Sequence, residues 1–258
     1  MAPSIEQLVE RQVLRWLEEQ HESLRSFPST PPPATEMARP MLCVSRQFGA
    51  LGGSVGRLVA ERLGYDFYGQ ELVDEIAKQA RVRRKIVESL DERLQTGIQQ
   101  WVDQLMSLRQ FASTDYLRNL SQVVLTLGRH GGSVLIGRGA HLILDPETTL
   151  RVRCYAPLDW RVEQAAARHD LSHDAARALL QRVDGERDAF YRSHFNTDVS
   201  DPEHFDLLLN TATTPLEACA RVIGEMLESR WPAAIPTAPK SQVRATRAPV
   251  AGKTRAAV

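Results

Sequence analysis

A glycine-rich stretch from Ser45 to Ser54 has the residue types for holding phosphate groups. It follows an apolar run and precedes a helical pattern, and Gly49, Gly52 and Gly53 would let backbone N–H groups point inward at phosphate oxygens. Ser54 would lie in the first helical turn, where its hydroxyl can contact a magnesium ion or a phosphate. A glycine-rich turn that only permits close packing of strand and helix is the other interpretation of the same residues.

This loop differs from the common motif G-x-x-x-x-G-K-[ST] because it has no lysine, whose position falls at Gly52 or Gly53. The lysine normally supplies positive charge to the terminal phosphates, so another cation is needed for phosphoryl transfer. Arg46, directly before the loop, and Arg57, one turn into the helix, are the candidates. We favour Arg46, because Arg57 projects from the helix towards solvent.

Other arginines could close such a site, since guanidinium groups match phosphate oxygens in geometry. Arg138 lies between two glycines at the end of an apolar run, where open α/β sheets bind ligands, so we expect binding rather than a surface ion pair. Arg161 and Arg168 lie seven residues apart on one helix face. The next helix carries Arg182, Arg187 and Arg192 with Asp184 and Asp188 between them, which fits either a lid or an exposed helix with ion pairs.

Metal and nucleophilic sites have no support in the spacing of the other residues. His169 and His173 are four residues apart, but Ser172 has the pattern of a helix cap between them. The three cysteines are far apart, and we expect buried, reduced thiols.

The elements that must position these residues alternate between short strands and helices. Apolar runs predict strands at 41–44, 133–136, 150–155 and 205–209, and helical spacing predicts helices at 55–63, 70–80, 158–169, 172–191 and after Thr214-Pro215. Residues 83–129 have a polar, long-period helical pattern. Four strands separated by long helices predict an α/β fold with a parallel sheet covered on both faces.

Four regions follow from these patterns: an N-terminal amphipathic helix (1–26), a proline-rich linker (27–40), the main domain (41–231) and a basic tail without fixed structure (232–258). The N-terminal helix could dock on its own body, form a homodimer, or bind another protein. We expect its own body or a homodimer.

The composition is that of an ordinary soluble domain, with 43% hydrophobic and 25% charged residues. Five of the 32 basic residues lie in the tail after residue 239, so the rest of the chain is slightly acidic and no nucleic-acid-binding surface is expected. No export signal or apolar span is visible, which predicts a cytoplasmic protein without membrane contact.

Four segments resemble the cytidylate-kinase-like family in the same order along the chain. They are the loop and helix from Val44 to Tyr68, the strand end 136–140, the stretch 155–161 and the strand 206–211. The resemblance covers roughly 41–230. It departs at Gly139, where cytidylate kinases proper have an acid, and at Gly69, where an aspartate is expected.

The resemblance implies a three-layer P-loop kinase fold with helical acceptor-binding and lid insertions, and ATP with Mg²⁺ as cofactors. By this resemblance Gly49, Gly52, Gly53 and Ser54 hold the donor phosphates, with Ser54 also at the metal. Arg138, Arg161 and Asp188 contact the acceptor, a nucleoside monophosphate such as CMP or dCMP. Arg46 replaces the lysine, and Arg187 and Arg192 close the lid. A non-catalytic nucleotide-binding module with this fold and a kinase for a non-nucleotide acceptor are the alternatives.

Overall fold

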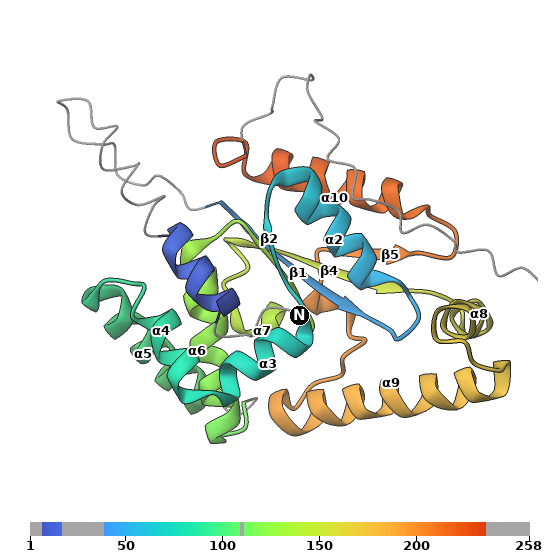
Figure 1. Cartoon of the computed structure of the whole chain (residues 1–258), viewed down its shortest axis with the longest axis horizontal. Helices are drawn as coiled ribbons and strands as arrows, with labels where there is room; N and C mark the ends of the chain where they lie inside the picture. Colours follow the sequence, from blue (N-terminus) through green and yellow to red (C-terminus); the bar gives the residue numbers. More distant parts are fainter. Residues whose placement is uncertain (1–6, 17–38, 109–110, 236–258) are drawn as a thin grey trace, which may run out of the picture.

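The computed structural model describes residues 7–16, 39–108 and 111–235 (Figure 1). The strands are β1 (Met41–Arg46), β2 (Asp66–Tyr68), β3 (Ser133–Ile136), β4 (Thr149–Tyr155) and β5 (Leu207–Asn210). The helices are α2 (Gly52–Leu63), α3 (Gln70–Lys78), α4 (Ala80–Val87), α5 (Glu92–Ser107), α6 (Asp115–His130), α7 (Ala140–Ile143), α8 (Leu158–His169), α9 (His173–Phe195) and α10 (Leu216–Arg230), with a short 3₁₀ turn at Pro202–His204. Residues 7–16 form a further helical segment.

The five strands form one parallel sheet in the order β2-β3-β1-β4-β5. β1 is central, and its Val44 is in register with Ile136 on β3 and with Val152 on β4. All five strands therefore end at the same edge of the sheet, where the loop after β1 and the turn after β3 become neighbours.

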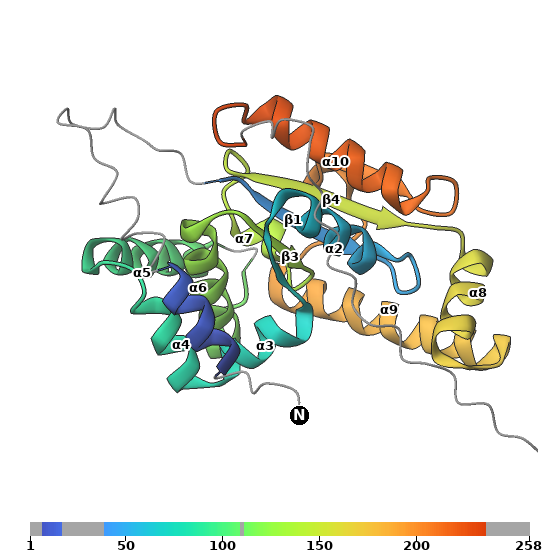
Figure 2. The same ribbon diagram turned by 45° about the horizontal axis from the view of Figure 1, so that its top comes forward.

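Helices cover both faces of this sheet. Successive residues of β1 point to opposite sides, and the apolar residues on each side are buried against helices. Leu42 and Val44 pack in one cluster with Val55 of α2 and Ile223 of α10. Met41 and Cys43 belong to the other cluster, with residues of α3, α6 and α9. Figures 1 and 2 both show α2 and α10 on one side and α3 to α6 on the other, with α8 and the start of α9 forming an arm at one end of the molecule.

This architecture is the predicted three-layer α/β fold, with differences at the ends of its elements. The strand at 133–136 and the helix at 158–169 have the predicted bounds. The prediction of four strands was wrong, because the sheet has a fifth strand, β2. This strand has no recognisable apolar run, since it has only three residues and begins with Asp66. The last helix begins at Leu216, directly after Thr214-Pro215, with Pro215 as its N-cap and no side-chain cap hydrogen bond.

The helical segment 7–16 docks on its own body. Val9 and Trp16 are each 4% exposed and join the cluster under α3 and α6. The Trp16 ring stacks on His130 with centroids 3.6 Å apart, and Gln12 donates to Asp66 at 2.6 Å. A homodimer through this segment stays a prediction.

The predicted proline-rich linker and basic tail lie largely outside the described residues. At the C-terminal end, Ala234 and Ile235 are buried against α2 and α10, so the packed domain extends past residue 231.

We expect Trp16→Ala to lower the free energy of unfolding by about 3 kcal/mol, because a buried aromatic ring is lost. Leu14→Ala, on the same segment but 59% exposed, is the control and should change it by less than about 0.5 kcal/mol. Urea unfolding measures both. Equal effects would mean that the segment does not dock as described.

Candidate functional site

The loop between β1 and α2 is a tight turn whose backbone conformation needs its glycine. Gly49 has φ +79°, and a Cβ at this position would lie 2.7 Å from the carbonyl oxygen of Arg161. Leu51, the N-cap of α2, has φ +54°, a conformation that favours glycine. In the common motif a glycine directly precedes the lysine, and Leu51 has this glycine-like conformation, so the missing lysine corresponds to Gly52. The Ser/Thr position of the motif then falls at Gly53, and Ser54 lies one residue further along α2.

The side chain of Arg46 takes the space that a residue at position 52 would need. A Cβ on Gly52 would lie 2.7 Å from Cβ of Arg46, and a Cβ on Gly137 would overlap with Arg46 Nη1. The arginine therefore runs between two glycines, and its Nη2 donates to Oε1 of Gln70 at 2.8 Å. Burial first, and then the nearby charge of Arg187, lower the pKa of Arg46 to about 10, so it stays protonated at neutral pH.

Three arginines from three segments meet at the carboxyl edge of the sheet. Arg46, Arg138 and Arg187 line one cavity of about 110 Å³, together with Gln70 and Tyr191 among others. The Nε groups of Arg138 and Arg187 are buried and have no hydrogen-bond partner within the described part of the chain. Three arginines and one acid, Glu186, line the cavity, so its net positive charge suits an anion.

An aspartate on α9 holds the loop in place from outside. Asp184 accepts from the backbone N–H of Phe48 at 2.8 Å and from Nη1 of Arg161 at 2.5 Å. Arg161 also donates to the carbonyl oxygens of Phe48 and Ala156, at 3.1 and 3.0 Å. Its side chain is only 8% exposed, so Arg161 positions the loop and does not line the arginine cavity.

Helix α9 also reaches the end of β1. Arg187 Nη1 donates to the carbonyl oxygen of Arg46 at 3.3 Å and lies 3.4 Å from Asp184. Burial lowers the pKa of Arg187 below its ordinary value, and the neighbouring Asp184 carboxylate offsets part of this shift.

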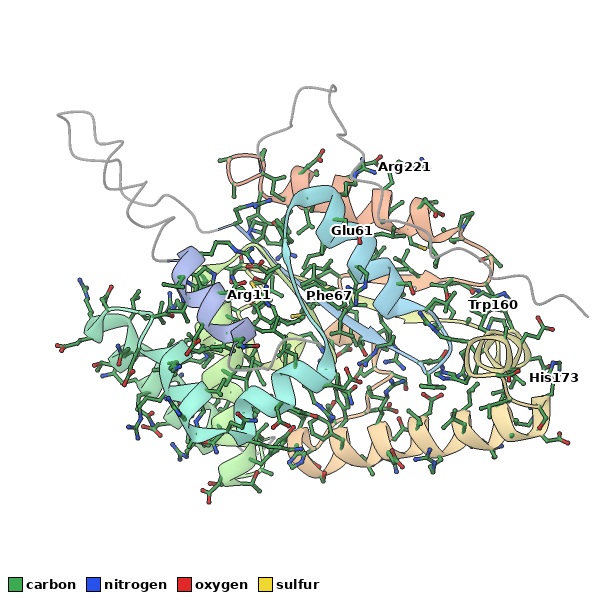
Figure 3. All side chains as sticks on the ribbon, in the orientation of Figure 1. Arg11, Glu61, Phe67, Trp160, His173 and Arg221 are labelled. Atoms are coloured by element: carbon green, nitrogen blue, oxygen red, sulfur yellow. The ribbon has the colours of Figure 1, made fainter. Side chains whose placement is uncertain are left out.

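A second cavity, of about 130 Å³, lies over the loop between α2 and α8. The glycines at 49, 52 and 53 line it, and Arg168 and His169 face them from α8. Ser54 lines a third cavity with Arg46, Gln70 and Glu71. Figure 3 shows Trp160 on α8 and His173 at the start of α9 on the side of the molecule away from helices α3 to α6.

Two of the residues predicted to contact ligands lie away from these cavities. The Arg192 side chain is 75% exposed and 3.9 Å from Asp188, which is itself 43% exposed. They lie on the outer face of α9, and neither lines the arginine cavity or the cavity over the loop.

Sequence reasoning missed Asp74, which pairs with Arg138, and Tyr116, which hydrogen-bonds to Asp74. Arg138 forms an ion pair with Asp74 on α3, and the Tyr116 hydroxyl on α6 donates to the same carboxylate at 2.7 Å. Neither residue lies in a motif: Asp74 lies in the predicted helix 70–80, and Tyr116 lies in the polar region 83–129. The only sequence signal was that an arginine at a strand end needs a carboxylate or an anion nearby.

The position after Arg138 has no room for a side chain. Gly139 has φ +67°, and a Cβ there would overlap with the ring of Phe195. The acid found here in cytidylate kinases proper could not be accommodated unless Phe195 moved.

Within the described ranges, no group of three or more His, Cys, Asp or Glu side chains could hold a metal ion by itself. In the same residues, no helix has the length and apolar character to cross a bilayer.

The parallel sheet, the loop after β1 and the helical insertions define a P-loop kinase fold. Residues 41–213, more than half of the chain, match the cytidylate kinase-like family, and the chain belongs to this family.

Three comparisons show more distant likeness. An uncharacterised protein from Eubacterium ventriosum is 16% identical, with a TM-score of 0.53 over 74% of this chain and 99% of its own. Shikimate kinase from Acinetobacter baumannii, in complex with shikimate, is 18% identical, with a TM-score of 0.41 over 74% and 93%. A uronate isomerase from Corynebacterium glutamicum is 28% identical over 102 residues, which are 39% of this chain and a fifth of that protein.

We expect Gly137→Ala to destabilise the protein by about 1–3 kcal/mol, because a Cβ would displace the Arg46 guanidinium and the φ of +75° is strained for alanine. Gly97→Ala, inside α5 with open space around it, is the control and should stabilise by up to about 1 kcal/mol. Urea unfolding measures both. A neutral Gly137→Ala would contradict the described path of Arg46.

Proposed function

We propose that this protein is a kinase that transfers the terminal phosphate of ATP to a small acceptor. A nucleoside monophosphate such as CMP or dCMP is the favoured acceptor. The observation that carries the proposal is the cavity in which Arg46, Arg138 and Arg187 meet beside a glycine-rich loop. Phosphoryl transfer needs little covalent chemistry from the protein, and positioned positive charge supplies most of the catalysis.

The residues around the loop fit the donor. Gly49 in the loop and Gly52 and Gly53 at the start of α2 line the cavity over the loop, and their backbone N–H groups suit the phosphates of ATP. Arg46 supplies the charge that the loop lysine supplies elsewhere. Bound Mg²⁺ would neutralise phosphate oxygens, and the Ser54 hydroxyl at the first turn of α2 is the protein oxygen suited to hold it.

The remaining arginines fit the acceptor and the transferred group. Arg138 binds the anionic end of the acceptor, and Arg187 on α9 stabilises the charge on the transferred phosphoryl group. Arg161 acts on the loop through Asp184 and Phe48. Arg192 and Asp188 reach a ligand only if α9 moves inward, as lid helices do on closure.

A second candidate function is a nucleotide-binding module that does not catalyse transfer. The observation that favours it is the packing of Phe195 against Gly139, which leaves no room for the acid of cytidylate kinases proper. The same packing is compatible with a kinase whose acceptor is not a cytosine nucleotide. For each of these functions we propose a cytoplasmic protein.

The test is ATP consumption with Mg²⁺ across a panel of nucleoside monophosphates and small alcohols. We expect turnover with CMP or dCMP, reduced on the order of a hundredfold in Arg187→Ala because a buried cation at the transferred group is lost. Arg182→Ala, on the same helix with its side chain 63% exposed, is the matched control and should keep turnover.

Each outcome of this panel assigns the protein to one class. Turnover with a non-nucleotide acceptor alone would replace the nucleotide proposal. ATP binding without consumption on any acceptor would favour the binding module.

A further inference from the structure

Arg138 forms its ion pair with Asp74, on α3. Arg138 Nη2 forms an ion pair with Oδ2 of Asp74, and the two side chains are 21% and 15% exposed. The other oxygen, Oδ1, accepts a hydrogen bond from the Tyr116 hydroxyl at 2.7 Å. Both carboxylate oxygens are thus engaged, one by the arginine and one by a residue of α6.

The guanidinium of Arg138 is also held by an aromatic ring and by its own backbone. Its Cζ lies 5.1 Å from the ring centroid of Phe190 on α9, within cation–π range. Arg138 has φ +56° between two glycines, so its side chain leaves the turn in a fixed and uncommon direction. Elements from three parts of the fold, α3, α6 and α9, therefore determine where the guanidinium lies.

These contacts leave donors of Arg138 free. Its Nε is buried without a partner within the described residues, and the side chain lines the same cavity as Arg46 and Arg187. A purely structural ion pair would bury both partners with their hydrogen bonds satisfied. This arrangement satisfies the carboxylate, while Arg138 keeps one buried donor unpaired and lines the cavity.

We propose that Asp74, with Tyr116 behind it, is a positioning residue that aims Arg138 at the anionic group of the acceptor; the identity of the acceptor rests on the proposed function. Asp74 does not touch the ligand in this account. It determines the affinity for the acceptor's phosphate through Arg138 and leaves the affinity for ATP unchanged.

The protonation of Tyr116 supports this arrangement. Burial raises the pKa of Tyr116, and its hydrogen bond to Asp74 raises it further, so the hydroxyl remains a donor at neutral pH and well above. A permanent donor behind Asp74 keeps one carboxylate oxygen occupied and leaves the other for Arg138.

The test compares Asp74→Asn and Tyr116→Phe with Asp103→Asn. Asp103 forms an ion pair with Arg118 on the surface of α5 and α6, so Asp103→Asn removes an Asp–Arg pair that does not line the arginine cavity. Calorimetry at low ionic strength measures binding of CMP, inorganic phosphate and ATP. Steady-state kinetics with CMP separate KM from kcat, and thermal unfolding reports any loss of stability.

We expect Asp74→Asn to weaken binding of CMP and of inorganic phosphate on the order of tenfold, because the charged partner that holds Arg138 is lost. The KM for CMP should rise by a similar factor, with kcat changed less than about threefold. Tyr116→Phe should give a smaller change of the same kind, and Asp103→Asn none. Binding of ATP should remain within about twofold in all three.

Unchanged binding of CMP and phosphate in folded Asp74→Asn would overturn the proposal. Tighter binding would also overturn it, because Asp74 would then compete with the ligand for Arg138. If the wild type binds phosphate but never consumes ATP with CMP, weaker phosphate binding in Asp74→Asn still supports Asp74, and only the proposed acceptor fails. Should Asp74→Asn not fold, Tyr116→Phe decides by the same criteria.

Discussion

The path of one arginine side chain constrains the rest of this site. Arg46 leaves the end of β1 and runs between Gly52 and Gly137, where neither position has room for a Cβ. The glycine at 52 marks where a P-loop lysine would stand, so the loop can hold the arginine or the lysine but not both. Because the guanidinium enters from the strand, it ends beside Gln70 and within the electrostatic range of Arg138 and Arg187.

The other parts of the site keep this cluster of like charges together. Asp184 connects α9 and Arg161 to the loop between β1 and α2, and Asp74 on α3 holds Arg138. Each carboxylate offsets part of the repulsion, and the arginine cavity still has buried donors without partners. An anion in this cavity would offset the remaining repulsion between the guanidinium groups, which is why phosphate chemistry fits the arrangement better than a purely structural role.

Local patterns were enough to predict the glycine-rich loop between a strand and a helix, the strand at 133–136 and the helix at 158–169. The choice of Arg46 over Arg57 stays a prediction, because both line the cavity that contains Ser54. They failed where long-range packing decides. Helical spacing put Arg161 and Arg168 on one face, but Asp184, 23 residues after Arg161, draws Arg161 inward and only Arg168 lines the cavity over the loop. The partners of Arg138 come from α3 and α6, whose approach to the sheet edge no sequence spacing records.

We propose that Arg46 supplies the positive charge of the missing lysine. The affinity for ATP with Mg²⁺, measured by calorimetry, tests this most directly. We predict that Arg46→Gly weakens binding on the order of tenfold or more, since a buried cation is lost from the phosphate site. Adding Gly52→Lys to this variant should recover most of the affinity, because the space left by Arg46 admits the new side chain and Cys154 must shift by only a few tenths of an ångström. Wild-type affinity in folded Arg46→Gly would contradict the account.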